Sequence, residues 1–273
     1  MKHNPGIGAT SDLSLRVSVA TLVRVVFQHP LNDEWMLALE RKATLHETEH
    51  EHVIEVKSQP FGGAIRILDL DALHDLIGDF HFDSESSRSE QDFRLFIRPS
   101  SWSVLREFCI QRLSHATDPV LETDPVRELV EEFDDALKIN LQPEQYISKP
   151  VATVVENEAA PTDTLHAEGM STVRVYRIFE ARILEALLGQ FMVTHSEGMS
   201  HNNLCELALD DFQNGGKGRA NGILTLPLEQ ITKAYGALSP TERNAPILFG
   251  KHYLDETVSA ILDDIPVPKY QRL

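Results

Sequence analysis

Hydrophobic and polar positions alternate along several short segments, a pattern typical of β-strands. Residues 15–27 are rich in β-branched side chains, and residues 35–40 follow a turn cluster at residues 30–33, so this region predicts a β-hairpin. The remaining strand-like runs are residues 53–56, 64–68, 93–97, 146–155 and 172–183. Gly62 and Gly63 predict a turn between the first two of these runs.

Apolar residues at three- and four-residue spacing predict helices between the strands. Trp102, Leu105, Cys109 and Leu113 form one amphipathic stripe, and the helical segments are residues 70–77, 102–113, a helix starting near Asp124-Pro125, a helix after residues 224–228, and residues 244–262. The polar tract at residues 84–91 is interpreted as a mobile loop and as the first site of limited proteolysis. Strands separated by helices without regular alternation predict an α/β (α+β) domain with an inserted segment.

The helix that begins near Pro125 has two opposite faces. At about 100° per residue, four carboxylates share one stripe, namely those of Glu128, Glu131, Glu132 and Asp135. Apolar side chains cover the other side and predict a buried face, namely Val126, Leu129, Val130, Phe133 and Leu137. Like charges at this spacing destabilise a helix, and a divalent cation bound to the carboxylates would offset that cost. The alternative is an acidic face exposed to solvent.

The overall charge restricts the class of partner. The 273 residues carry 25 Lys and Arg against 42 Asp and Glu, a formal net charge of −17. This charge argues against broad nucleic-acid binding and favours phosphate recognition through bound divalent metal. Cys109 and Cys205 do not suffice for a disulfide framework, and no apolar stretch has the length of a signal-peptide core or a membrane span. We therefore expect a cytoplasmic protein without a membrane partner.

One motif on the acidic helix matches a known family. Residues 127–132, Arg-Glu-Leu-Val-Glu-Glu, resemble the core of the Nudix box, G-x5-E-x7-R-E-U-x-E-E-x-G-U, in which U is a bulky aliphatic residue. Upstream, Pro60-Phe61-Gly62-Gly63 resembles the P-G-G that opens the box. The hairpin ending in Glu40-Arg41 and the segment at residues 224–228 also fit the surroundings of such a box.

The resemblance implies a fold and a division of the chain. It implies a Nudix-like α/β/α sandwich with a mixed sheet at residues 14–262, including an insertion at about residues 69–118 and a C-terminal helical extension. A flexible N-terminus at residues 1–13 and a C-terminal tail at residues 263–273 complete the chain.

The resemblance also implies a chemistry. Glu128, Glu131 and Glu132 are the expected ligands of Mg²⁺ or Mn²⁺, with the carbonyl of Gly63 or its neighbour Gly62 as a further ligand. Arg127 is expected to be buried and to hold a glutamate in place. The implied activity is hydrolysis of a small-molecule nucleotide derivative, a nucleoside diphosphate linked to another moiety, because bound metal polarises the diphosphate and activates water. The expected catalytic residues are Arg127, Glu131 and Glu132, and the candidates for the general base are Glu132, Glu156, Glu158 and Glu168.

The chain departs from the family pattern at three points. Gly63 and Arg127 are more than sixty positions apart, which requires the inserted segment, and Pro119 and Asp134 stand where the box has a glutamate and a glycine. Glu122 is the candidate replacement for that glutamate. These departures favour the alternative of a catalytically inactive module that binds a nucleotide or a protein. A third hypothesis is that the helix carrying Trp102 and Leu105 docks a partner or a second copy, giving a homodimer.

Two further motifs are candidates for binding a metal ion or a phosphate. Residues 46–50 read H-E-x-x-H, the zinc-protease pattern, but the surrounding residues are charged rather than apolar, so we favour a solvated loop over metal binding by His46, His50 and His52. The glycine-rich residues 214–222 lack P-loop spacing, and we favour a surface connection over phosphate contact by Lys217 and Arg219.

Overall fold

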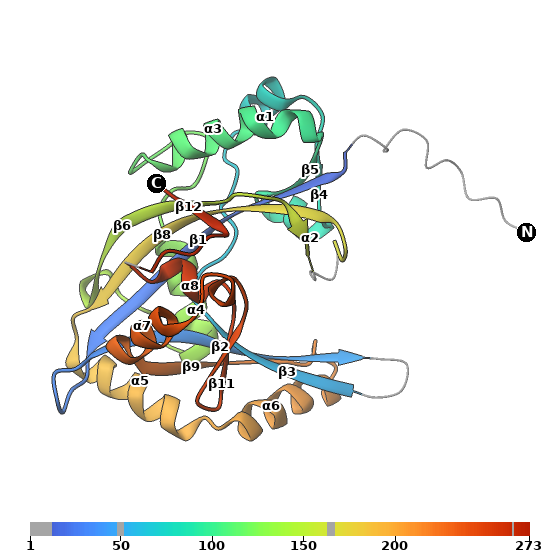
Figure 1. Ribbon diagram of the computed structural model, residues 1–273. Coiled ribbons are helices and arrows are strands. Elements are labelled where there is room, and N and C mark those ends of the chain that lie inside the picture. Colours follow the sequence, from blue (N-terminus) through green and yellow to red (C-terminus); the bar gives the residue numbers. More distant parts are fainter. Residues whose placement is uncertain (1–12, 48–51, 163–166, 264) are drawn as a thin grey trace, which may run out of the picture.

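The computed structural model describes residues 13–47, 52–162, 167–263 and 265–273, and its backbone forms one curled mixed sheet with helices around it (Figure 1). The strands are β1 (Leu15–Gln28), β2 (Trp35–Glu47), β3 (His52–Gln59), β4 (His81–Phe82), β5 (Arg94–Ile97), β6 (Tyr146–Glu156), β7 (Ala160–Pro161), β8 (Ser171–Ile183), β9 (Arg219–Pro227), β10 (Ile247–Phe249), β11 (His252–Leu254) and β12 (Tyr270–Arg272). The helices are α1 (Leu70–Ile77), α2 (Glu85–Glu90), α3 (Trp102–Leu113), α4 (Val126–Leu137), α5 (Ala186–Gly198), α6 (His201–Gln213), α7 (Leu228–Ala237) and α8 (Val258–Ile261). None of the helices in these ranges is long and apolar enough to span a membrane.

The longest strands form the centre of the sheet. The principal order is β10-β11-β3-β2-β1-β8-β6-β12, with β9 beside β2 and β5 beside β1. β1 runs parallel to β8 and antiparallel to β2, and β2 is antiparallel to β3 and β9. The predicted hairpin of β1 and β2 and the mixed α+β class are therefore confirmed.

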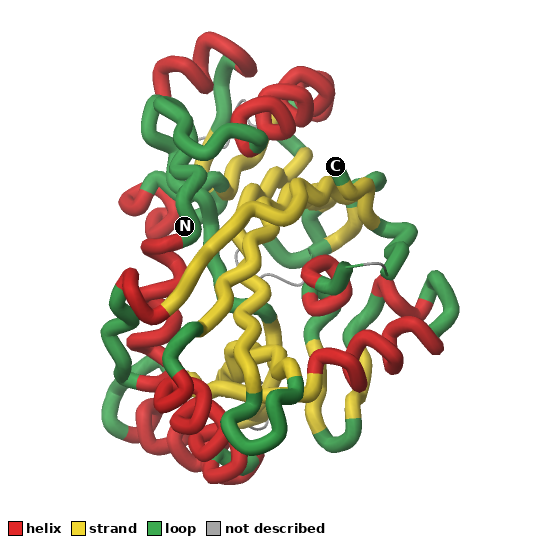
Figure 2. The backbone as a smooth tube through the Cα atoms, turned by 90° about the vertical axis from the view of Figure 1, so that its left-hand side faces the viewer, coloured by secondary structure: helices red, strands yellow, loops and turns green. Residues whose placement is uncertain are grey.

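Helices cover both faces of this centre, as the rotated view shows with strands in the middle and helices on either side (Figure 2). Along β1, Val23, Val25 and Phe27 pack with α4 and α5, whereas Leu22 and Val26 pack with α7 and α8. Successive side chains of a strand point to opposite faces, so a continuous apolar run is buried on both sides. This explains why β1 is rich in valine rather than strictly alternating.

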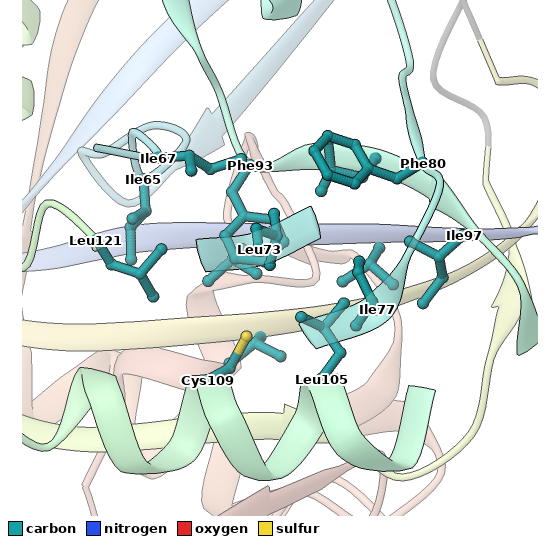
Figure 3. Packing of buried hydrophobic residues seen from close by; sticks show 14 of the residues in the cluster. Ile65, Ile67, Leu73, Ile77, Phe80, Phe93, Ile97, Leu105, Cys109 and Leu121 are labelled. Carbon is teal, nitrogen blue, oxygen red and sulfur yellow. The ribbon is translucent and has the colours of Figure 1, made fainter. Parts of the chain in front are cut away.

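The segment between the Gly62-Gly63 turn and α4 packs as a separate cluster on the N-terminal end of β1. Leu105 and Cys109 of α3 point toward Leu73 and Ile77 of α1, and all four are buried (Figure 3). The chain enters and leaves this region side by side: the Leu68 amide donates to the Val120 carbonyl at 2.7 Å, and the Glu122 amide donates to the Arg66 carbonyl at 2.9 Å. About fifty residues therefore intervene without separating the turn from α4 in space.

Three predictions about local structure are wrong. The strand-like run at residues 64–68 forms isolated bridges, such as that of Ala64 with Ala20, instead of a strand. Residues 84–91 contain helix α2, because the Ser84 side chain caps it by accepting from the Ser87 amide, and buried Arg16 holds Asp83 just before it at 2.6 Å. The segment is therefore helical rather than the expected loop, and early proteolysis within it stays a prediction. Residues 244–262 form β10, β11 and the short α8 instead of one helix, since Pro246 and a turn at Gly250 (φ +60°) interrupt it.

The last residues are part of the sheet. β12 pairs with β6 from Tyr270 to Arg272, and the Leu273 amide donates to the Thr153 carbonyl at 2.8 Å. Helices α5 and α6, which the sequence pattern did not predict, follow one another along the sheet, α5 against β9 and α6 against β9 and β2 (Figure 1).

Candidate functional site

The Gly62-Gly63 turn lies directly against the start of α4. The Thr21 amide of β1 donates to the Gly63 carbonyl at 2.9 Å, and the Val23 amide donates to the Phe61 carbonyl at 2.7 Å, so β1 fixes the turn. A Cβ atom on Gly63 would lie 1.9 Å from Oε2 of Glu128. Only a residue without a side chain lets this carboxylate approach so closely. Residues more than sixty positions apart thus form one site.

Gly62 has a different reason to be glycine. Its φ is +139°, and a Cβ atom there would lie 2.0 Å from the Thr21 carbonyl oxygen. This backbone conformation is accessible to glycine and strained for other residues. The turn therefore requires glycine at position 62, and the close approach of the Glu128 carboxylate requires it at position 63.

Arg127 is the centre of an ion-pair group at the same place. Its Nε and Nη2 atoms donate to the Glu122 carboxylate at distances from 2.7 to 3.1 Å, and Nη2 lies 2.6 Å from Oε1 of Glu128. The same Nη2 atom donates to the Ala64 carbonyl at 3.2 Å, and Nη1 lies 3.3 Å from Glu131. Arg127 thus holds glutamates in place, and Glu122 occupies the position expected of a replacement partner. Its side chain is half-buried rather than fully buried.

Glu128 is buried, and its pKa is perturbed. Burial, together with the neighbouring charges of Glu131 and Glu132, raises the pKa of this carboxyl to about 7 against the opposite effect of Arg127. A bound cation would reverse this effect by favouring the charged form.

The raised pKa predicts a pH dependence of stability for the metal-free protein. Because the folded pKa lies above the ordinary 4.5, stability contributed by neutral Glu128 is present below about pH 4.5 and is lost as the pH rises through about 7. The expected loss is about 3 kcal/mol, at 1.36 kcal/mol per pKa unit. Glu128→Gln should flatten this part of the curve of unfolding free energy against pH, measured by urea denaturation in EDTA. Asp134→Asn, on the exposed side of the same helix, is the control, and an unchanged slope in Glu128→Gln would contradict the assignment.

A second acidic group lies next to Glu132. Lys42 of β2 lies 2.7 Å from Oε2 of Glu40 and 3.4 Å from Oε1 of Glu132. Burial and the adjacent Glu40 carboxylate raise the pKa of Glu132. Burial lowers the pKa of Lys42, but the two carboxylates raise it above its ordinary value overall. Glu40 is fully buried and accepts from Gln59 at 3.2 Å through Oε2, while its Oε1 has no hydrogen-bond partner among the residues that the structure describes.

The donor set has the chemistry of a magnesium site, although it is compensated by basic side chains. Among the described residues, no three acidic, histidine or cysteine side chains are arranged to hold a metal ion, since Glu128 contacts Arg127 and Glu132 contacts Lys42. Glu131 is mostly exposed. The orphaned Oε1 of Glu40 and the oxygens of Glu128 and Glu132 are nevertheless hard ligands of the kind that Mg²⁺ binds. By their chemistry these oxygens suit a divalent cation, but in the structure the described carboxylates are paired with Lys42 and Arg127 instead.

A cavity of about 980 Å³ opens beside this acidic group. Lys42 and Gln59 connect the cavity to Glu40 and Glu132, and Asp135 and Lys138 bring the end of α4 to its wall. Its basic side chains are those of Arg16, Lys42, Arg94, Lys138, Arg174 and Arg219, against the acidic Asp83 and Asp135. Four of these cations are paired with carboxylates, Arg16 with Asp83, Lys42 with Glu40, Arg94 with Asp92 and Arg174 with Glu156, so an anion in the cavity would be met mainly by Lys138 and Arg219.

Several sequence candidates lie elsewhere. Glu156 is buried and bound by Arg174 at 3.1 Å and Lys269 at 3.0 Å, so it is held as a structural ion pair, whereas Glu158 and Glu168 are exposed. His46 is in β2 and His52 starts β3, so the H-E-x-x-H residues do not share a helix, and His50 lies outside the described residues. The expected solvated loop is thus partly strand.

Other residues of the site were missed from the sequence. Of the two residues considered for phosphate contact, Arg219 lines the cavity and Lys217 does not. No role was assigned from the sequence to Glu40, Lys42, Arg16, Arg94 or Arg174. For Glu40, its position as a charged residue inside an apolar strand is a signal that could have identified it.

Comparisons of the chain with protein-family models, curated proteins and solved structures give no match.

Proposed function

We propose that this chain is a Mg²⁺-dependent hydrolase with a Nudix-like site that cleaves a nucleoside diphosphate linked to another moiety. The observation that carries the proposal is the contact of Gly63 with Glu128, which places the glycine turn and the acidic helix together across the intervening segment. The adjacent cavity supports it, because its volume and basic lining suit a phosphorylated small molecule.

Each group then has a role. Glu128, Glu132 and Glu40 are the residues that would hold Mg²⁺ or Mn²⁺, with Glu131 and the Gly63 carbonyl at the edge of the site. The bound ion supplies polarisation of the diphosphate and an activated water. Arg127 fixes Glu122 and Glu128, and is a positioning residue. Arg174 and Arg219 would bind substrate phosphate oxygens from the other wall of the cavity.

One observation favours a second function. Lys42 already compensates Glu40 and Glu132, so the acidic group is neutralised without a metal. A chain in which Lys42 stays in place would bind a nucleotide in the basic cavity without hydrolysing it. This is the inactive binding module that Pro119 and Asp134 also favour.

The test is turnover on a panel of dinucleotides, nucleotide sugars and coenzyme A at pH 8. Release of nucleoside monophosphate or phosphate is measured with Mg²⁺, with Mn²⁺ and with EDTA. The hydrolase predicts release with either metal and none with EDTA. Binding of a panel member by calorimetry without any turnover would support the binding module instead.

Arg219→Ala tests the role of the cavity. Arg219 lies outside the acidic group and lines the cavity from β9, so its removal should raise KM about tenfold and leave kcat nearly unchanged. Steady-state kinetics on the best panel substrate measure both constants. Lys217→Ala, two positions away and outside the lining, is the control with the same change of charge. Equal KM values for the three proteins would place the substrate elsewhere.

A further inference from the structure

A second cavity, of about 470 Å³, lies on another part of the molecule and shares no lining residue with the first. Its walls come from β2, β9, the junction between α5 and α6, and the turn between β10 and β11. Strand β2 contributes to both sites, because Lys42 contacts both Glu40 and Glu132 while the preceding residue, Arg41, points the opposite way, to Met199.

Arg41 is the most unusual residue of this cavity. It is 3% exposed, and its Nη1 atom donates to the Met199 carbonyl at 2.7 Å. Within the part of the chain that the structure describes, it forms no ion pair with a carboxylate. Burial lowers the pKa of Arg41. A buried charge without a counter-ion is costly, so a negative group from outside the chain would stabilise it.

Further donors face the same space. Lys251 and His252 line the cavity, and Nδ1 of His252 is buried with no hydrogen-bond partner in the described part of the chain. Burial lowers the pKa of His252, as do the charges of Arg41 and Lys251. The 13-residue helix α6 begins at the cavity, where Ser200 caps it and Asn202 lines the wall. The start of a helix favours negative charge.

The other titratable groups of the lining do not compensate this charge. His29 and His201 carry imidazole side chains, which supply no negative charge. Glu197, the acidic residue of the lining, is exposed at the end of α5 and forms no ion pair with Arg41 among the described contacts. Apolar side chains complete the walls, namely Met36, Val193, Met199 and Leu224. The cavity thus combines a basic end with an apolar surface, and its volume is in the range of small-molecule sites.

We propose that this second cavity binds a phosphate-bearing small molecule, with Arg41 and Lys251 as the main contacts of the phosphate and the start of α6 as a further donor. The proposal does not depend on hydrolysis at the first site. A phosphate suits the fork of a guanidinium together with an ammonium and the start of a helix better than a single carboxylate does.

The methionines supply a local readout. Met36 and Met199 line the cavity, whereas Met170 does not. Protein labelled with ¹³C at the methionine methyl groups is titrated with inorganic phosphate in metal-free buffer, and with acetate at the same ionic strength. Signals are assigned with Met→Leu variants. We expect phosphate to shift the Met36 and Met199 signals in a saturable manner, to leave Met170 unchanged, and to act at lower concentration than acetate.

Variants identify the contacts. Arg41→Gln should abolish the shifts, and Lys251→Ala, which changes an exposed side chain and should fold normally, should weaken phosphate binding about tenfold. Lys233→Ala on α7 removes the same charge elsewhere, and Arg219→Ala alters the first cavity, so both should bind like the wild type. The proposal is overturned if phosphate leaves Met36 and Met199 unshifted, if Lys251→Ala binds phosphate as tightly as Lys233→Ala, or if acetate binds as tightly as phosphate.

Discussion

Glu132→Gln is expected to lower kcat/KM for the best panel substrate by about 10³-fold, which corresponds to about 4 kcal/mol of transition-state stabilisation. The substitution preserves the shape of the side chain and removes the negative charge that a divalent cation needs. Glu132 faces Lys42 and Glu40 rather than the apolar core, so the fold should be retained. Steady-state kinetics at pH 8 with saturating Mg²⁺ measure the loss, and circular dichroism checks the fold.

Asp134→Asn is the matched control for this variant. It neutralises an exposed carboxylate two positions along α4 and should keep activity within about twofold of the wild type, since surface substitutions of this kind have small effects. Loss of folding in Glu132→Gln would show that the group of Glu40, Lys42 and Glu132 is structural. Unchanged activity in Glu132→Gln would remove it from the reaction.

Gly63→Ala is expected to have the second largest effect. The added Cβ atom would lie 1.9 Å from Oε2 of Glu128, so the carboxylate must rotate away and its contact with Arg127 is disturbed. We expect a loss of about 1–3 kcal/mol in the free energy of unfolding, as for other overpacked sites. Activity should fall at least about 100-fold, because a displaced group at a reacting centre costs this much. Urea denaturation and the panel assay measure the two effects.

Gly198→Ala is the control with the same chemical change. Gly198 ends α5, and a Cβ atom there meets no atom within 4 Å. This variant should match the wild type in stability and activity. Equal behaviour of Gly63→Ala and Gly198→Ala would show that Glu128 does not need the close approach, and would contradict the site.

Much of the fold follows from local patterns in the sequence. β1, β2, β6 and β8 were predicted from β-branched runs, and α3 and α4 from apolar residues at helical spacing, because each of these elements buries a regular stripe of side chains. α2 was missed because its stability comes from serine caps and from the distant ion pair of Arg16 with Asp83. The strands β10 and β11 were missed because each has only three residues, and because β11 is joined to the sheet by its pairing with β3, which is far away in sequence.

The residues of the site were likewise predicted only where they lie close together in the sequence. The carboxylates of α4 were predicted because they are close in sequence and share one helix face. Glu40, Lys42 and the arginines of the cavity come from strands that meet only in the folded sheet, so no spacing along the chain reveals them. The approach of Gly63 to Glu128 was expected only through the resemblance, and the bonds joining residues 66–68 to residues 120–122 explain how it is achieved.

Whether the acidic group of α4 binds a divalent cation is measured most directly with Mn²⁺ by electron paramagnetic resonance, which detects the free ion. The protein at pH 8 should remove Mn²⁺ from solution at a saturable site, added Mg²⁺ should release it, and Glu132→Gln should abolish the binding while Asp134→Asn retains it. Mn²⁺ that stays free in the presence of the wild-type protein would contradict a metal-dependent hydrolase. Lys42 would then be the permanent counter-ion of Glu40 and Glu132.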